Sequence, residues 1–367
     1  MGLHDCVRSL RPFSLEEALR EPDLALDDLR ALFRCEQDPI WHAEGNVGVH
    51  TQRVLEALWE EWGELDEASR LVLNYAALAH DLGKPATTER QPDGRITARG
   101  HEAAGCGPAR RLLEHWGVER EARQEIIALV EHHLVPMHSG NVDAARIGTL
   151  VQPPWLWRLA RADARGRVSE TVPELLARIG AFSDLCRAQA CWGAAPDPWL
   201  EDADFAALQI PESEREAWRR RLRWARYRSW VKSRDAARPW VERERGRRGG
   251  HLVLTAGIAG SGKTRALSER FPGVPVVAVA ELPARLRAGE AVAVDAPHLD
   301  RARHAVVDAG RIAGARVTLI FCDAPLEECL SRLRTRGGSF DPEELRRLHG
   351  RLRGPRPAEA DEVVWVP

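Results

Sequence analysis

The sequence predicts a multidomain protein in which an all-α domain is followed by an α/β domain with a parallel sheet. Two patterns carry this prediction. Between residues 47 and 192, apolar residues recur at helical spacing in one segment after another, with no strand-like alternation. After residue 251, short apolar runs alternate with helical segments, as in a parallel α/β sheet. The length of 367 residues suits two or three domains.

The composition is that of a soluble globular protein, with 44% apolar and 29% charged residues. No apolar run reaches the roughly 18 residues that a membrane span needs, and Met1–Arg11 lacks the apolar core of a signal peptide. We therefore expect a cytoplasmic protein without membrane contact. The seven cysteines form no Cys-x-x-Cys pair, which fits reduced thiols.

Lysine is rare, since only Lys84, Lys232 and Lys263 are lysines among the 53 basic residues. Lys84 and Lys263 lie in segments that carry candidate sites. A compact ammonium charge fits there in a way that a planar guanidinium does not.

The helical part is expected to begin with a lead over residues 1–40, in which Ser14 caps a helix and Glu17 stands at capping-box spacing. A larger domain over residues 41–195 follows. Gly83 and Pro85 end its second helix. The helices expected in this domain are Val47–Trp62, Leu71–Leu82, His101–His115, Glu121–His133, Leu156–Arg165 and Val172–Trp192.

Eight of the thirteen histidines lie within residues 42–138. Neutral imidazoles and carboxylates are ligands of first-row transition metals, and this domain has enough of them for two ions. Taken singly, His42, His115 and His138 are better explained as hydrogen-bonded residues without a ligand role. The series that points to metal comprises His50, His80, Asp81, His101, His132, His133 and Asp163.

This series resembles the HD-domain metal-dependent phosphohydrolases. It is most similar to the N-terminal half of bacterial HD–polynucleotide kinase fusions, which heal RNA and DNA ends. HD domains of tRNA nucleotidyltransferases share the first two motifs less completely. The resemblance covers about residues 35–195, an HD-type domain. It rests on Trp41–Thr51, His80–Pro85, Gly94–His101, His133–Pro136 and Ala162–Arg167.

The resemblance implies two divalent ions, with Asp81 as the bridge. Lys84 and Arg167 would contact the phosphate, and His132 is a candidate extra ligand. Histidine-rich ligation favours Mn, Ni, Co, Fe or Zn over Mg. One ion would be held by His50, His80, Asp81 and Asp163. The other would be held by Asp81, His101 and His133.

These residues suit phosphate-ester hydrolysis. A metal pair supplies a clamp on the phosphoryl group and an activated water. Lys84 and Arg167 would stabilise the charge that builds on the non-bridging oxygens. No nucleophilic side chain is needed.

Residues 196–249 are expected to form a helical linker rich in arginine and tryptophan. Fourteen cations lie between Arg215 and Arg248. Basic residues interleaved with aromatic ones suit single-stranded nucleic acid. A solvated helix whose tryptophans form a core explains them equally well. The aromatic residues are Trp218, Trp224, Tyr227, Trp230 and Trp240.

The C-terminal region, residues 250–367, opens with an apolar strand over Leu252–Ala256, a glycine-rich loop and a helix from Arg265. Strand, glycine loop and helix is the context of a P-loop. Its N–H groups would cradle the phosphates of ATP, Lys263 would reach the β/γ oxygens, and Thr264 would hold Mg²⁺. The nucleotide-binding residues are expected to be Gly257, Gly260, Ser261, Gly262, Lys263, Thr264 and Asp295. Further strands are expected at Pro275–Ala280, Ala291–Asp295, Arg316–Cys322 and Glu362–Val366.

This region resembles the P-loop polynucleotide kinases in three further segments, Asp295–Leu299, Leu330–Arg336 and Pro355–Trp365. The resemblance implies that Arg332 and Arg336 form a lid and act with Lys263 on the transferring phosphate. From the residues alone, these arginines are equally well explained as part of a solvent-exposed helix face.

One departure affects the expected kinase activity. The family places an aspartate that accepts the proton of the 5′-hydroxyl after the second strand, followed by a segment that holds the acceptor. This sequence lacks that stretch, and Glu281 and Arg285 are its nearest substitutes. Since phosphoryl transfer needs a group that positions the nucleophile, we expect the kinase to be weak, altered or inactive.

The leading hypothesis is an enzyme that heals nucleic-acid ends. Its HD domain would remove 2′,3′-cyclic, 2′- or 3′-phosphates from RNA ends, and DNA ends are a further candidate substrate. Its P-loop domain would bind ATP and phosphorylate 5′-hydroxyls, and an RNA ligase is a candidate partner. One alternative is an HD phosphohydrolase of nucleotides or other phosphate esters with a non-catalytic nucleotide-binding domain. Another is a nucleotide-gated nucleic-acid-binding module.

Overall fold

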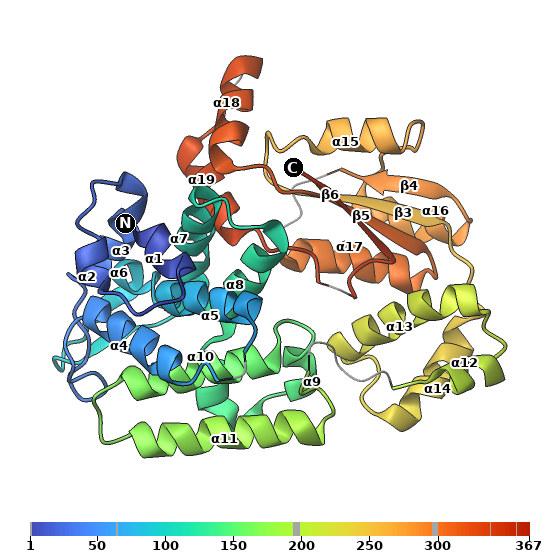
Figure 1. Cartoon of the computed structure of the whole chain (residues 1–367). Helices are drawn as coiled ribbons and strands as arrows, with labels where there is room; N and C mark the ends of the chain where they lie inside the picture. The colour runs from blue at the N-terminus through green and yellow to red at the C-terminus, as the bar shows by residue number, and fades with distance from the viewer. Residues whose placement is uncertain (1, 64, 194–198, 296–299, 338, 357) are drawn as a thin grey trace. The chain divides into compact units, whose positions relative to one another are not determined.

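The computed structural model describes residues 2–63, 65–193, 199–295, 300–337, 339–356 and 358–367. The chain divides into two compact units, Met1–Pro196 and Asp197–Pro367 (Figure 1). The first unit is helical, and the second contains a four-stranded parallel sheet, so the predicted fold class is confirmed. Among the described residues, no helix has the length and apolar character needed to pass through a bilayer.

The N-terminal segment, predicted as a separate lead, shares the hydrophobic core of the first unit. Leu3, Leu15 and Leu29 are buried in the same cluster as Leu55 and Leu73. The helices of this unit are α1 Leu3–Arg8, α2 Leu15–Ala18, α3 Asp27–Leu32, α4 Val47–Glu60, α5 Glu67–Ala79, α6 Lys84–Thr87, α7 His101–His115, α8 Arg120–His132, α9 Ala144–Ile147, α10 Pro153–Gly166 and α11 Val172–Ala188. Short 3-10 segments occupy Leu24–Leu26 and Val135–Asn141.

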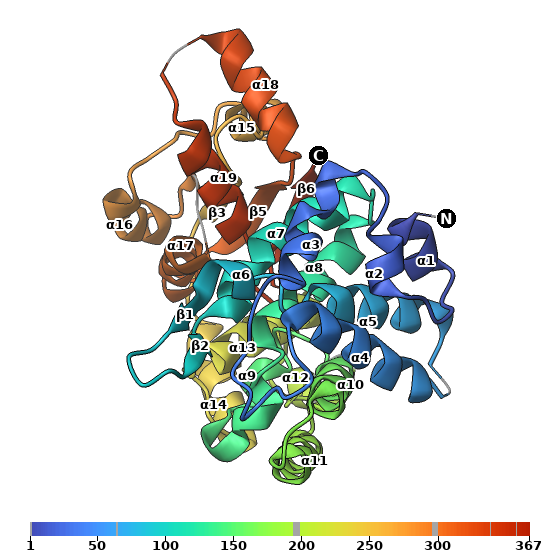
Figure 2. The same cartoon turned by 90° about the vertical axis from the view of Figure 1, so that its left-hand side faces the viewer.

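Helices α4, α5 and α10 pack together in the core of the first unit (Figure 2). Helix α4 begins at Val47 because the Asn46 side chain accepts a hydrogen bond from the Val49 N–H at 3.0 Å. Asp66 caps α5 in the same way, through Ser69 N–H at 2.7 Å. The buried faces of α4 and α10 carry His50 and Asp163, and His80 and Asp81 follow the end of α5. The other two histidines of the candidate site lie at the start of α7 and directly after α8.

The first unit also contains a small hairpin that the sequence did not reveal. Strands β1 Thr88–Arg90 and β2 Ile96–Ala98 pair antiparallel. Each strand has only three residues, too few for a recognisable alternation of apolar and polar positions. The hairpin ends shortly before α7 and therefore helps to fix where His101 begins that helix.

The second unit begins with three helices, α12 Asp202–Ala207, α13 Glu212–Tyr227 and α14 Arg234–Glu244. They have a core of their own that includes Phe205 and Leu222. Trp224 on α13 also donates its indole N–H to Asp308 at 3.0 Å. The segment predicted as a linker is therefore helical, and it belongs to the second compact unit.

The sheet of the second unit has the strand order β4-β3-β5-β6, with all neighbours parallel. From β3 the chain runs to β4 at one edge of the sheet, and from there it crosses back over β3 to β5. Because both crossovers are right-handed, the helices within them pack on opposite faces of the sheet. Figure 1 shows α15 and α17 on opposite faces. The strands are β3 His251–Ala256, β4 Ala291–Val294, β5 Arg316–Cys322 and β6 Glu362–Val366. The helices are α15 Lys263–Arg270, α16 Leu282–Arg287, α17 Asp300–Ile312, α18 Leu326–Arg336 and α19 Pro342–Arg351, and a 3-10 turn covers Val279–Glu281.

The predicted strand at Pro275–Ala280 is wrong. This segment makes a single bridge to the sheet, between Val276 and Ala293. Val276 and Val279 are exposed, so the apolar run that suggested a strand is not covered. Pro275 lacks the N–H that a longer ladder would use, and the chain turns at Val279.

Candidate metal and phosphate sites

Three histidines of the first unit share one hydrogen-bonding pattern. Each donates its Nδ1–H to the backbone carbonyl three residues earlier, which leaves Nε2 with a free lone pair. The Nε2 atoms of His101 and His133 lie 3.3 Å apart. Two lone pairs at this distance favour a cation between them. The acceptors are Ala77 for His80 at 2.8 Å, Ala98 for His101 at 2.7 Å and Val130 for His133 at 2.7 Å.

Asp81 lies between two groups of these ligand atoms. Its Oδ1 is 3.2 Å from His101 Nε2 and 4.0 Å from His133 Nε2. Its Oδ2 is 3.2 Å from His80 Nε2 and 3.9 Å from His50 Nε2. A carboxylate with one oxygen toward each group would be able to offer a ligand atom to a cation held by either group.

The six residues predicted as metal ligands therefore come together from helices far apart in the sequence. They form two sets, and within each set the ligand atoms lie within 4.8 Å of one another. His50 Nε2 is 3.0 Å from Asp163 Oδ1, which joins α4 to α10. Their role as ligands stays a prediction. The sets are His50, His80 and Asp163, and Asp81, His101 and His133.

The charges of these residues suit a cation. Burial by itself would raise the pKa of Asp81 and of Asp163, but the surrounding basic side chains hold each pKa well below its usual range. Burial lowers the pKa of His133 to about 3, so its ring is neutral at pH 7. Ionised carboxylates and neutral imidazoles are the protonation states that metal binding requires.

His80 is a buried imidazole beside two carboxylates. Burial would lower the pKa of His80, but the neighbouring Asp81 and Asp163 raise it instead. Its Nε2 is buried and forms no hydrogen bond of suitable geometry in the described part of the chain. An unsatisfied buried group costs about 1–3 kcal/mol. The donor set of imidazole nitrogens and carboxylate oxygens fits a divalent transition-metal ion at this point.

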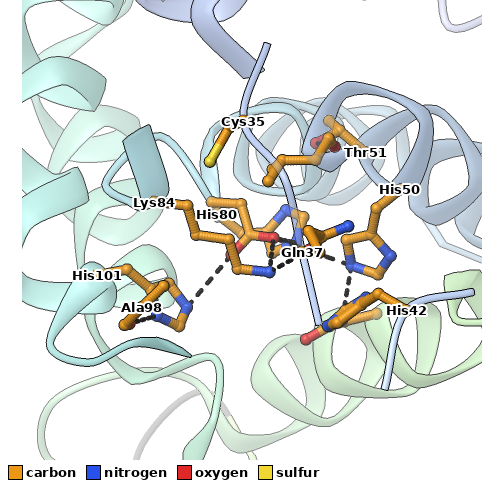
Figure 3. Close-up of polar contacts among 12 residues, drawn as sticks. Cys35, Gln37, His42, His50, Thr51, His80, Lys84, Ala98 and His101 are labelled. Atoms are coloured by element: carbon orange, nitrogen blue, oxygen red, sulfur yellow. Dashed lines mark hydrogen bonds and ion pairs between the residues drawn. The ribbon is translucent and has the colours of Figure 1, made fainter. Parts of the chain in front are cut away.

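A cavity of about 330 Å³ opens beside the ligands. Lys84 lies in its wall, with Nζ 2.8 Å from Asp81 Oδ2 and 2.7 Å from Gln37 Oε1. Arg167 lines it too, with a guanidinium nitrogen 3.1 Å from Asp163 Oδ2. In Figure 3, His101 and Lys84 lie on one side of His80, and His50 lies on the other side. A phosphate in this cavity would meet two cations next to the ligands. Apolar wall residues are Trp41, Ile96, Leu134, Met137 and Leu175.

Glu44 is a residue of the site that the sequence analysis missed. Its Oε1 accepts a hydrogen bond from His42 Nδ1 at 2.8 Å and lies 2.9 Å from His50 Nδ1, while Oε2 accepts from Val168 N–H at 2.7 Å. Burial would raise the pKa of Glu44, but the two imidazoles lower it. The carboxylate is therefore charged and fixes His50 with Nε2 toward Asp163, as carboxylate–histidine–metal arrangements do. Its position within Trp41–Thr51 was the available signal.

Glu44→Gln is expected to weaken metal binding about 10–100-fold, the usual cost of losing such a partner of a ligand histidine. Glutamine keeps the size of Glu44 but offers one acceptor oxygen without charge. The dissociation constant would be measured by competition with a chelator. Glu67→Gln is the control, because Glu67 is exposed on α5 and belongs to neither ligand set. Equal affinity in the two variants would contradict a positioning role for Glu44.

Gly83 allows the segment between Asp81 and Lys84 to contact α7. A Cβ at Gly83 would lie 2.0 Å from His101 O and 2.5 Å from Gly105 N, and both are backbone atoms that cannot move aside. We expect Gly83→Ala to lower the free energy of unfolding by about 3 kcal/mol, the upper end of overpacking costs. Chemical denaturation would measure it. Gly180→Ala is the control, because no atom lies within 4 Å of its added Cβ, and a similar loss in both variants would contradict the contact.

The remaining histidines of this unit lie outside the two ligand sets. His132, the candidate extra ligand, is half-buried at the end of α8, and the sets found among the described residues do not include it. His115 pairs with Asp23 at 3.1 Å. His138 Nδ1 donates to Leu134 O at 3.0 Å, and its side chain lines the cavity.

The glycine-rich loop of the second unit follows β3 at the carboxyl edge of the sheet, where α/β proteins bind ligands. Gly257, Gly260 and Gly262 have φ of 141°, 81° and 95°, which other residues rarely adopt. A Cβ at Gly257 would lie 2.6 Å from Cys322 O, and one at Gly260 would lie 2.6 Å from Cys329 O. The loop thus requires glycine for both conformation and space.

The polar residues of the loop form hydrogen bonds within the loop and with Asp295. Lys263 Nζ donates to Ile258 O at 2.7 Å, within the loop, and Ser261 donates to the same carbonyl at 2.8 Å. The Thr264 hydroxyl donates to Asp295 Oδ2 at 2.6 Å, and Thr255 donates to Oδ1 at 2.7 Å. Thr264 and Asp295 therefore offer adjacent oxygens of the kind that Mg²⁺ prefers.

The two predicted lid arginines differ in position. Arg332 donates to Gly260 O at 3.2 Å and pairs with Glu328, so it lies against the loop. Arg336, one turn further along α18, is exposed. Residues 296–299 of the resemblance to polynucleotide kinases lie outside the described residues.

The two residues considered as substitutes for the acceptor site make local contacts. Glu281 accepts a hydrogen bond from Ala278 N–H at 3.1 Å. Arg285 pairs with Glu290. Neither contact reaches the glycine-rich loop, so the expectation of a weak or altered kinase stays a prediction.

Comparison with protein families identifies both parts of the chain. The HD domain family model matches residues 47–179, and an AAA domain model matches residues 277–355. The second match begins after the glycine-rich loop. The chain thus carries an HD domain followed by a P-loop kinase-like domain.

Curated proteins similar to the chain include tRNA-related enzymes. The multifunctional CCA protein of Halorhodospira halophila is 30% identical over 52% of this chain and 46% of its own length. The A-adding tRNA nucleotidyltransferase of Deinococcus radiodurans is 29% identical over 56% of this chain and 48% of its own. The multifunctional CCA protein of Pseudoalteromonas atlantica is 31% identical over 35% of this chain and 32% of its own. The chain spans less than half the length of these relatives.

Proposed function

We propose that the chain is a nucleic-acid end-healing enzyme whose HD domain removes 2′,3′-cyclic, 2′- or 3′-phosphates from RNA ends. The observation that supports this most is the position of Asp81 between two ligand sets, beside Lys84 and Arg167 in one cavity. The similarity to HD–polynucleotide kinase fusions supports the RNA end as substrate. One similar protein is named for adding nucleotides to tRNA, which also points to RNA ends.

In this proposal the side chains bind and orient, and water reacts. Bound divalent ions supply Lewis acidity and an activated water. Lys84 and Arg167 bind the non-bridging phosphate oxygens, and Gln37 holds the Lys84 ammonium at the wall of the cavity. The water oxygen bonds to phosphorus, the bond from phosphorus to the ribose oxygen breaks, and that oxygen takes the proton of the water. For a cyclic phosphate the step occurs twice.

The P-loop domain is proposed to bind ATP and Mg²⁺ and to phosphorylate 5′-hydroxyls weakly. Gly257 to Thr264 would hold the triphosphate, with Asp295 beside the Mg²⁺ and Arg332 near the transferring phosphate. The missing acceptor segment is the reason to expect low activity. A 3′-hydroxyl and a 5′-phosphate are the ends that an RNA ligase joins, which makes such a ligase a candidate partner.

The size of the cavity favours a second candidate function. A volume of about 330 Å³ lies in the range of pockets for small ligands, of which a single nucleotide is one. The HD domain would then hydrolyse nucleotides or other small phosphate esters, and the P-loop domain would only bind nucleotide.

One reaction tests the proposal. The protein is incubated with Mn²⁺, Mg²⁺, ATP and a short RNA that has a 5′-hydroxyl and a 2′,3′-cyclic phosphate, and mass spectrometry reads both ends. Loss of the 3′ phosphate supports the HD assignment, and a gain of phosphate at the 5′ end adds the kinase. An unchanged 3′ end would overturn the assignment of RNA ends and favour small phosphate esters.

A further inference from the structure

A second cavity, of about 290 Å³, lies within the second unit. Helices α13 and α14 form one wall, and Arg311 on α17 and Gly314, which follows this helix, form another. Gly314 shortly precedes β5, so this cavity lies at the amino edge of the sheet. The glycine-rich loop follows β3 and lies at the opposite, carboxyl edge. The two sites are therefore separate.

The aromatic residues of α13, α14 and the segment between them divide into two kinds. Trp218, Trp224, Tyr227 and Trp240 are buried, so for these four the interpretation as core residues is confirmed. Trp230 is 37% exposed and lines the cavity together with Trp218 and Trp240. An exposed indole at the rim of a cavity offers a flat apolar face to a ligand.

The same cavity has more cations than carboxylates. Glu244 forms ion pairs with both Arg243, at 3.2 Å, and Arg247, at 2.8 Å. Four arginines line the cavity, and the other two, Arg221 and Arg311, also share a single carboxylate, so each pair has one negative charge for two positive ones. An anionic group in the cavity would supply the missing negative charge.

Asp361 is the carboxylate of that second pair. It is 2.6 Å from Arg311 and 3.5 Å from Arg221, whose guanidinium also lies over the Trp218 ring at 5.2 Å. Arg311 is buried, and its Nε has no hydrogen-bond partner in the described part of the chain. Burial lowers the pKa of Arg311, so a bound anion would stabilise its charged form.

We propose that this cavity binds a nucleotide unit, with the base stacked on Trp230 and a phosphate held by Arg243 and Arg247. Stacking on an aromatic face together with arginine on the phosphate is how proteins hold single-stranded nucleic acid without sequence preference. The unit comes from an RNA strand or from a free nucleotide. The inference does not depend on the activity of the HD domain.

The test is the binding of fluorescein-labelled decauridine RNA, followed by fluorescence anisotropy in EDTA without ATP. Trp230→Ala is expected to weaken binding at least about fivefold, the lower end of the cost of losing one stacked base. Arg243→Ala is expected to weaken it at least about tenfold, because a hydrogen bond to a charged phosphate is lost. Arg347→Ala is the matched control, because Arg347 is an exposed, ion-paired arginine on α19 away from the cavity. Thermal unfolding of all variants checks that they are folded.

Two further arms identify the source of the nucleotide. Decauridine containing 4-thiouridine is crosslinked by light, and mass spectrometry maps the attached peptide, which is expected to contain Trp230. Competition by unlabelled UMP only at far higher concentration than RNA assigns the site to an RNA strand, and competition at similar concentration assigns it to free nucleotide. If both variants bind RNA and UMP as the Arg347→Ala control does, the proposal is overturned.

Discussion

Asp81→Asn is expected to reduce phosphohydrolase activity about a thousandfold, the largest loss from any single change in the HD domain. Asparagine has nearly the same shape, but it lacks the charge that faces both ligand sets and Lys84. Lewis acidity is worth several kcal/mol of transition-state stabilisation, and each 1.36 kcal/mol corresponds to about a tenfold change in rate. The loss of kcat on RNA with a 3′-phosphate would be measured at saturating metal.

The metal content of the same variant separates binding from catalysis. We expect purified Asp81→Asn protein to hold fewer metal ions per chain than the wild type, by elemental analysis. Asp184→Asn is the matched control, since Asp184 is exposed on α11 and belongs to neither ligand set. Full activity and full metal content in Asp81→Asn would remove Asp81 from the site.

Lys263→Ala is expected to weaken ATP binding at least about tenfold and to leave the phosphohydrolase unchanged. A hydrogen bond to a charged group is worth about 1.5–3 kcal/mol, and Lys263 would make at least one to the phosphates. Its Nζ already lies within the loop, against Ile258 O. Isothermal titration with ATP and Mg²⁺ would measure the change.

Lys232 provides the control for this experiment, because it is the one lysine of the sequence outside the two sites and it is exposed. Lys232→Ala should bind ATP like the wild type. Equal ATP affinity in Lys263→Ala and Lys232→Ala would mean that the loop does not bind the triphosphate in the proposed manner.

The long helices of the first unit and the four strands of the parallel sheet could be predicted because their signals are local. Asn46 and Asp66 cap α4 and α5, and the apolar periodicity identifies the buried faces. The strand expected at Pro275–Ala280 failed for the opposite reason. Its apolar residues look like a strand, but pairing depends on a neighbour that the local sequence does not show, and only Val276 pairs.

The candidate site could be predicted where potential metal ligands follow one another on successive helices, as His50, His80 and His101 do. Glu44 lies within the motif Trp41–Thr51, but its role depends on contacts with two imidazoles that only the fold brings about. The tryptophans of α13 and α14 show the same limit. Spacing alone gave no means to separate the exposed Trp230 from the buried Trp218.

The most direct test of the proposed function compares one phosphate in two settings. The kcat/KM for hydrolysis of a 2′,3′-cyclic phosphate would be measured at the end of a decameric RNA and on a free nucleoside, with the same metal and base. An end-healing enzyme should prefer the RNA by at least about tenfold, which corresponds to about 1.4 kcal/mol of additional binding in the transition state. Equal values, or a preference for the nucleoside, would contradict the account and favour an enzyme of small phosphate esters.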